Sequence, residues 1–210
     1  IISLSPAGIA GVLIFGIRAL LVIAVCVASC IAFEYISRKV MKRSVTLGDL
    51  SAVVTGLLLA YNLPVSIPLW MCIVGSFVAI VIVKQLFGGI GQNFANPAIT
   101  ARIVMLVSFA SAMTNFTQPT LWRYDAVASA TPLSELSALD MTGDIPSQIK
   151  TLANGGNLPE LKEMLFGVRA GCIGETCAAA LLLGAVYLIA RGIISVRIPF
   201  AYIATVGVFM

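Results

Sequence analysis

Long apolar segments separated by short polar turns make up most of the chain, and one long polar stretch interrupts them. The segments have the length of helices, and the alternating pattern of about ten residues that marks outer-membrane strands is absent. The pattern therefore predicts an all-α, polytopic membrane protein. Seven segments are expected, at residues 1–15, 19–36, 49–61, 67–86, 96–113 and 172–190 and from residue 198 onward.

Two of these segments, 49–61 and 96–113, are short for a full membrane crossing and are flanked by glycine and proline, which indicates broken helices. A faint repeat relates the two halves of the chain, because Gly48–Ala52 resembles Gly174–Ala178 and Ile67–Leu69 resembles Ile198–Phe200. The copies are an odd number of crossings apart and so have opposite orientations. Inverted repeats with broken helices are typical of folds that bind ligands near the membrane midplane.

Three regions follow from this division: membrane segments of a first half at 1–113, a polar loop at 114–170, and the start of a second membrane half at 171–210. The chain begins and ends inside apolar runs, so we expect it to be truncated at both ends.

The basic residues predict the orientation. Arg38, Lys39, Lys42 and Arg43 mark a cytoplasmic loop, and alternation of the segments places Lys84, Arg191 and Arg197 on the same side. The 114–170 loop then lies outside the cytoplasm, and its four basic and six acidic residues give a net charge of −2. The expected location is the inner membrane, with several crossings.

The composition supports this class, since 60% of the residues are hydrophobic and only 10% are charged. The absence of histidine removes the commonest metal ligand and general base. Cys26 and Cys30 share a helix face, which would suit a metal or an iron–sulfur cluster, but small buried side chains in a membrane core are the favoured interpretation. We therefore predict no catalytic side chain and no metal site.

The polar loop contains the sequence DAVASATPL, residues 125–133, in which Thr131 precedes Pro132. One interpretation makes Thr131 a helix N-cap with proline in the first helical position. The other makes its hydroxyl the carrier of a covalent phosphoester, since small neighbours leave room for a bulky group and a helix N-terminus attracts phosphate. Both can hold together, and from the residues alone the N-cap interpretation is preferred.

A second polar motif, FGGIGQNFANPAIT, occupies residues 87–100. Asn96 and Pro97 have the pattern of an N-cap and first residue of a half-helix. Glycines permit close backbone approach, and the side chains of Asn93 and Asn96 both donate and accept hydrogen bonds, which suits a neutral planar heterocycle. The alternative is a tight cytoplasmic turn followed by a helix cap.

Asp49 and Glu175 stand where the two repeat copies begin. As carboxylates within or near the membrane they would be ion or proton sites. As acids in a first helical turn they would instead stabilise the helix dipole. The sequence leaves both interpretations open.

Three motifs together resemble the RnfD/NqrB family: LFGGIGQNFANPA, DAVASATPL and GCIGETCAAALLLGAVYLI, in this order. The resemblance implies a fold similar to urea transporters and FMN esterified through its phosphate to Thr131. Asp125 is retained. The family usually has Ser/Thr-Gly-Ala-Thr before Pro-Leu, whereas Ala128, Ser129 and Ala130 precede Thr131 here. We expect Asp125, Ser129, Ala130 and Thr131 to contact the covalent FMN. Asn93, Asn96 and Glu175 are the candidates for contact with a second, non-covalent flavin such as riboflavin.

SFASAMTNF at residues 108–116 and Arg197–Pro199 resemble the RnfD branch more than the NqrB branch, which belongs to the sodium-pumping NADH:quinone reductase and is the alternative within the family. The resemblance implies an electron-carrying component of the Rnf complex, a ferredoxin:NAD oxidoreductase that translocates Na⁺ or H⁺. The implied partners are other Rnf membrane subunits, an extracytoplasmic FMN-bearing subunit, a soluble NAD-handling subunit, a flavin transferase and the lipid bilayer, without nucleic acid. A solute channel or transporter without cofactor is the alternative from another class.

Overall fold

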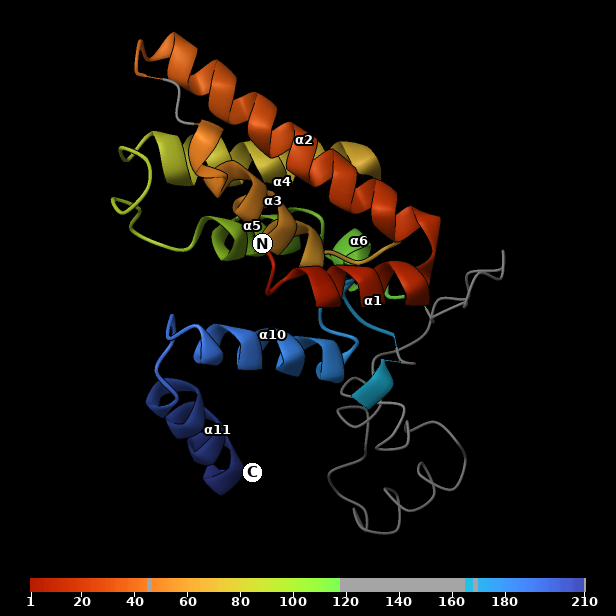
Figure 1. The fold of residues 1–210 in the computed structure, drawn as a ribbon. Coiled ribbons are helices and arrows are strands. Elements are labelled where there is room, and N and C mark those ends of the chain that lie inside the picture. The colour runs from red at the N-terminus through yellow and green to blue at the C-terminus, as the bar shows by residue number, and fades with distance from the viewer. Residues whose placement is uncertain (45–46, 118–164, 168–169, 210) are drawn as a thin grey trace.

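The computed structural model describes residues 1–44, 47–117, 165–167 and 170–209, which form helices and no β-strand (Figure 1). This confirms the all-α class for the described part of the chain. The helices are α1 (Ser5–Phe15), α2 (Ile17–Val40), the short 3₁₀ turn η1 (Leu47–Asp49), α3 (Ser51–Tyr61), α4 (Leu69–Phe77), the π-helical η2 (Val78–Gln85), α5 (Pro97–Ser108), α6 (Ala110–Thr114), α10 (Ala178–Ala190) and α11 (Arg197–Phe209).

Helix α2 is the longest of the described helices in the first half. Among the described helices it alone is long and apolar enough to cross a membrane, and the other apolar helices are shorter. The sequence predicted a segment ending at Ile36, but the helix continues to Val40 and includes Arg38 and Lys39. Long basic side chains can lie along an apolar helix while their charged ends reach water, so the hydropathy pattern ended before the helix did.

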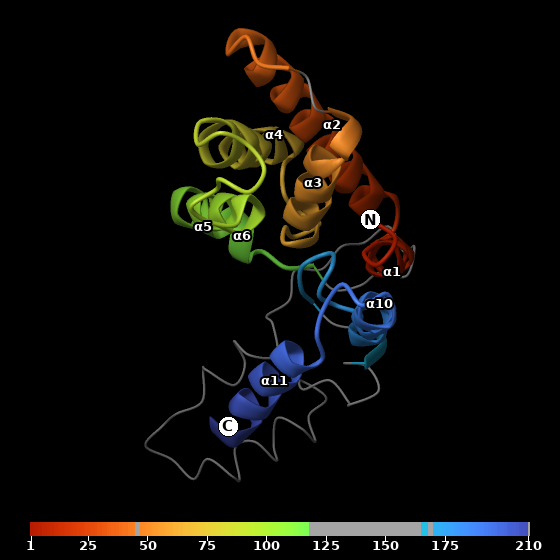
Figure 2. The same ribbon diagram turned by 60° about the vertical axis from the view of Figure 1, so that its left-hand side comes forward.

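Helices α3 and α4, with η2, pack against α2, and α5 packs against η2, α3 and α4 (Figure 2). Helix α1 turns back from α2 at Gly16, which has a positive φ of 75°, and lies along α10 in both views. Gly56 of α3 allows a close approach to α2, because a Cβ at this position would lie 2.8 Å from the Cα of Val27. Small residues thus set the spacing of the first-half bundle.

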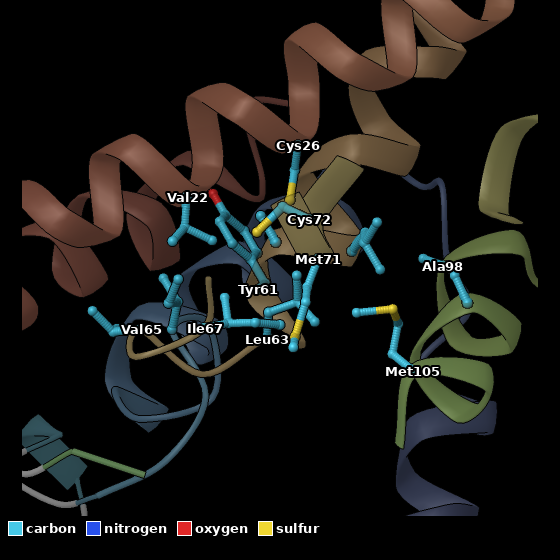
Figure 3. Packing of buried hydrophobic residues seen from close by; sticks show 14 of the residues in the cluster. Val22, Cys26, Tyr61, Leu63, Val65, Ile67, Met71, Cys72, Ala98 and Met105 are labelled. Atoms are coloured by element: carbon cyan, nitrogen blue, oxygen red, sulfur yellow. The ribbon is translucent and has the colours of Figure 1, made fainter. Parts of the chain in front are cut away.

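Apolar side chains from α1, α2, α3, α4, η2 and α5 form the core, together with non-helical residues after α3 and Ile173, and Figure 3 shows part of this cluster. Cys26 of α2 and Cys72 of α4 lie in this cluster, and Cys30 lies in a smaller one with Ala52 and Ile80. All three are buried free thiols. This agrees with the interpretation of Cys26 and Cys30 as core side chains.

The described helices also carry many large apolar side chains on their outer faces. A soluble domain rarely exposes so much apolar surface, whereas lipid or a neighbouring membrane subunit would cover it. On α5 and α10 the exposed large apolar residues include Ile99, Ile103, Val107, Leu182, Leu183 and Val186.

The two halves meet where their helices are interrupted, at a place that we call the junction (residues 61–67 and 170–177). The N–H of Ile173 donates to the carbonyl of Leu63 at 3.2 Å, and the N–H of Gly174 donates to that of Tyr61 at 3.0 Å. These bonds satisfy backbone groups that no helix satisfies. A Cβ on Gly174 would overlap the side chain of Tyr61, so glycine is required there.

Other boundaries differ from those expected. The segment predicted at 96–113 breaks at Phe109, whose φ of −134° and ψ of 51° separate α5 from α6. The segment predicted from Cys172 becomes helical only at Ala178, because the preceding residues belong to the junction.

Candidate functional site

The glycine-rich loop ends at Asn96, which caps α5. Its Oδ1 accepts hydrogen bonds from the N–H groups of Ala98 at 3.1 Å and Ile99 at 3.5 Å, and Pro97 is the first helical residue. The predicted N-cap is confirmed. Because this oxygen already accepts hydrogen bonds from the first turn of α5, Asn96 is less able than expected to accept a hydrogen bond from a cofactor.

Asn93, in the same loop, is half-buried, and its Oδ1 is buried with no hydrogen-bond donor. Beside it in sequence, the rings of Phe94 and Phe87 pack edge to face with centroids 4.8 Å apart. Gly88 and Gly89 have positive φ values that bend the loop. The structure thus distinguishes the two asparagines, because the side-chain oxygen of Asn93 has no hydrogen-bond partner whereas that of Asn96 caps α5.

Glu175 is exposed and lies in the junction, ahead of Cys177, the N-cap residue of α10. The interpretation of Glu175 as a first-turn acid is therefore wrong, because α10 begins later than the apolar pattern indicated. Its carboxylate lies close to Gly171.

A polar cluster at the junction was not singled out from the sequence. Arg102, halfway along α5, donates from Nη1 to Oδ1 of Asn62 at 2.7 Å, and its Nη2 lies 3.7 Å from Sγ of Cys172. The hydroxyl of Thr176 is buried nearby in sequence with no hydrogen-bond partner. A single arginine inside an apolar segment was the available signal, since such charges mark functional positions in membrane proteins.

Asp49 lies in η1, directly before α3. Its Oδ1 accepts hydrogen bonds from the N–H of Ser51 at 2.9 Å and from the hydroxyl of Ser51 at 2.7 Å. Partial desolvation acts to raise the pKa of Asp49, but these two bonds, with the charges of Lys84 and Arg38, outweigh it and hold the pKa below its usual value. Asp49 therefore stabilises the start of α3 as a carboxylate.

A buried ion pair also went unrecognised in the sequence. Nζ of Lys84 lies 3.0 and 2.9 Å from the two carboxylate oxygens of Glu34, and both side chains are buried. The basic-residue pattern predicts that Lys84 lies on the cytoplasmic side, and in the structure it lies in the last turn of η2 with its side chain buried. The signal was present, because opposite charges in two apolar segments are expected to pair.

Thr131, Asp125, Ser129 and Ala130 lie outside the described residues. Among the residues that the structure describes, no group of three or more histidine, cysteine or acidic side chains could hold a metal ion.

Comparison with known proteins gives a consistent result. The profile of the NQR2, RnfD, RnfE family matches residues 1–210. The D subunit of the Na⁺-translocating ferredoxin:NAD⁺ oxidoreductase complex of Acetobacterium woodii is 47% identical over 100% of this chain, and the D subunit of the proton-translocating complex of Clostridium ljungdahlii is 41% identical over 99%. The D subunit of the ion-translocating oxidoreductase complex of Rhodobacter capsulatus is 33% identical over 97%. The chain spans 61% of the length of each of these relatives.

Proposed function

The chain belongs to the NQR2, RnfD, RnfE family, and from this premise we propose that it is part of the D subunit of an Rnf-type ferredoxin:NAD⁺ oxidoreductase complex. In this role it carries electrons within a membrane complex that moves Na⁺ or H⁺, and another subunit handles NAD. The observation that carries the proposal is the 47% identity, over the whole chain, to a relative with that name. The three relatives described above are all D subunits by name, which favours this assignment over the quinone-reductase subunit.

The electron carrier in this proposal is FMN, joined through its phosphate to Thr131, with Asp125, Ser129 and Ala130 around the attachment point. The support is the motif DAVASATPL within a chain of this family. When bound, the flavin supplies the redox chemistry, and the protein orients it.

A second, non-covalent flavin belongs to the same proposal, with Asn93 as its contact. The buried and unpaired Oδ1 of Asn93 fits a ring N–H donor, and Phe87 and Phe94 lie in the same loop. Asn96 fits less well because its oxygen caps α5. Glu175 is exposed in a different segment, and its contact with a flavin remains part of the proposal.

We place the protein in the inner membrane with several crossings, in an inverted-repeat fold similar to urea transporters. The outward apolar side chains and the meeting of two helix breaks at the junction support this arrangement. The partners are the other membrane subunits, an FMN-bearing extracytoplasmic subunit, a soluble NAD-handling subunit and a flavin transferase.

Intact-mass analysis of the subunit from the purified complex tests the proposal. A mass increase of one FMN less one water, with in-gel fluorescence after denaturation, is expected. A subunit of unmodified mass, in a preparation without flavin absorbance, would instead favour a channel or transporter.

A further inference from the structure

Arg102 is the only charged residue of α5, and its side chain reaches the junction. The guanidinium is partly buried, and it bonds to the amide oxygen of Asn62 at 2.7 Å and to the thiol sulfur of Cys172 at 3.7 Å. Both partners are neutral, and sulfur is a weak acceptor. Because a guanidinium carries several N–H donors, these two bonds leave donors for a further group. A positive charge placed in this way inside an apolar helix is expected to act on a ligand.

Thr176 provides a second polar group at the junction. It is 0% exposed, and its hydroxyl oxygen has no hydrogen-bond partner among the described residues. The chain turns here, because the N–H of Glu175 donates to the carbonyl of Cys172 at 3.3 Å. Thr176 therefore lies back beside Gly171, where a Cβ would be 3.3 Å from its Cγ2. A buried hydroxyl without a partner is costly, so a bound group is expected to satisfy it.

The polar loop that contains Thr131 leaves and rejoins the described structure at the junction. Near its start, the hydroxyl of Ser66 donates to the carbonyl of Asn115 at 2.5 Å. Near its end, the thiol of Cys177 donates to the carbonyl of Leu165 at 3.8 Å. Ser66 and Cys177 both belong to the junction, so both ends of the loop are bonded to the part of the protein that holds the two polar groups.

The polar edge of a flavin ring matches these groups. This edge carries carbonyl oxygens and ring nitrogens, which accept from a guanidinium and bond to a hydroxyl. Reduction by two electrons and one proton leaves a negative charge on this edge, at N1 and the C2 carbonyl oxygen. A guanidinium binds a planar group of that kind through parallel N–H bonds, and partial burial strengthens the attraction. Charge near N1 is one of the means by which proteins tune a flavin.

We propose that Arg102 contacts the N1 and C2 carbonyl edge of the flavin carried by the 114–170 loop and stabilises its reduced form. The inference rests on the proposed function, because it requires that flavin. Asn62 holds the guanidinium in place, and the hydroxyl of Thr176 bonds to another polar atom of the same ring. The positive charge raises the reduction potential of this flavin, so electrons pass to it more readily from the extracytoplasmic FMN-bearing subunit.

Glu175 places the opposite charge at the same junction. One of its carboxylate oxygens would lie 3.4 Å from a Cβ on Gly171, the residue before Cys172. Negative charge at this place opposes the reduction of a nearby flavin, whereas the charge of Arg102 favours it. Loss of the two charges should therefore shift the potential in opposite directions, and general damage to the junction would shift it in one direction.

Redox titration of the intact complex, followed by flavin absorbance, tests the charge effect. The complex with Thr131→Val lacks this flavin under the proposal, and subtraction of its signal isolates the flavin of interest. In Arg102→Gln the ratio of reduced to oxidised flavin at a given potential should fall about tenfold or more, a downward shift of about 30 mV for a two-electron couple. Arg191→Gln, which removes an exposed charge after α10, should leave the potential unchanged. Retained flavin with an unchanged potential in Arg102→Gln would overturn the proposal.

Two further variants separate the charge effect from damage to the fold. Glu175→Gln should raise the potential, because it removes negative charge at the same place. Arg102→Lys keeps the charge without the planar fork, so its potential should lie between those of Arg102→Gln and the wild type. A fall of equal size in Arg102→Gln and Glu175→Gln would show disturbed packing and would contradict the proposal.

Chemical labelling needs no change at Arg102 and gives an answer even if its variants fail to assemble. The wild-type and Thr131→Val complexes are treated with phenylglyoxal, and the modification of arginine is read by peptide mass spectrometry. Arg102 should react several-fold faster in Thr131→Val, where no ring covers it, whereas Arg191 should react equally in both complexes. Equal reaction of Arg102 in the two complexes would overturn the proposal.

The mass and the in-gel fluorescence of the wild-type subunit keep this inference distinct from the proposed function. Covalent flavin, together with an unchanged potential in Arg102→Gln and equal labelling of Arg102, rejects the role of Arg102 alone. A wild-type subunit without flavin rejects the proposed function, and this inference with it.

Discussion

Nη1 of Arg102 lies 2.7 Å from Oδ1 of Asn62, and this hydrogen bond joins the middle of α5 to the end of α3. Asn62 in turn donates from Nδ2 to the carbonyl of Leu58 at 2.8 Å, so its amide is held by the last turn of α3. The guanidinium therefore meets a positioned acceptor at the place where the helix breaks. Arg102 secures the junction from the side of α5.

Replacing Arg102 by Leu is expected to destabilise the protein by about 1–3 kcal/mol, because Asn62 then keeps a partly buried acceptor without its donor. Thermal melting of the purified complex measures the change. Arg191→Leu, at an exposed position after α10, serves as the matched control. If the bond matters, Asn62→Leu should cost less in the Arg102→Leu background than in the wild type. Fully additive losses would show that the two residues act separately.

Gly174→Ala tests the contact between the two halves. The added methyl group would overlap Tyr61, and in a close-packed interior such overpacking costs about 1–3 kcal/mol. Gly207 of α11 is the control, since a Cβ there meets nothing within 4 Å and alanine favours a helix by about 1 kcal/mol. Thermal melting should thus rank Gly174→Ala below the wild type and Gly207→Ala at or above it. The opposite order would show that the junction adapts readily.

Local signals in the sequence predicted much of this architecture. Asn96 before Pro97 indicated a helix start, and the glycine and proline beside segment 49–61 indicated a short helix, which is α3. These predictions succeeded because capping groups and proline act on their own turn of the backbone. The interpretation of Glu175 as a first-turn acid failed because Gly174 pairs with Tyr61, a distant residue, and α10 starts only after this pairing.

The buried ion pair of Glu34 and Lys84 could not be predicted from local patterns. Glu34 and Lys84 are 50 residues apart, and the hydrophobic periodicity of one segment does not indicate which residue of the other segment pairs with it. The rule that buried charges pair would have indicated Lys84 as a partner for Glu34, but only if Lys84 had been recognised as buried. Arg102 was missed for the same reason, since its partner Asn62 comes from another helix.

Thr131→Val is expected to abolish the covalent flavin, because valine keeps the shape of threonine but has no hydroxyl to form the phosphoester. In-gel fluorescence after denaturation measures the loss. Thr142→Val, in the same predicted loop, should retain wild-type fluorescence. Covalent flavin that persists on the Thr131 variant would move the attachment point to another residue.

The orientation predicted from the basic loops places residue 154 outside the cytoplasm. A cysteine introduced for Asn154 should therefore react with a membrane-impermeant thiol reagent in intact cells. A cysteine introduced for Lys42, in the basic loop, should react only after the cells are broken. The opposite pair of results would show that the topology is the reverse of the one predicted.

The two asparagines of the glycine-rich loop should respond differently to substitution. Asn96→Ala removes the cap of α5 and should lower stability by about 1 kcal/mol while the flavin content stays unchanged. Asn93→Leu removes an acceptor that no donor satisfies, so stability should change little, whereas the proposed non-covalent flavin should be lost and the covalent one retained. Acid-extracted flavin, quantified beside the fluorescence of the denatured subunit, separates the two pools. Unchanged extractable flavin in Asn93→Leu would leave this loop with the structural role of starting α5.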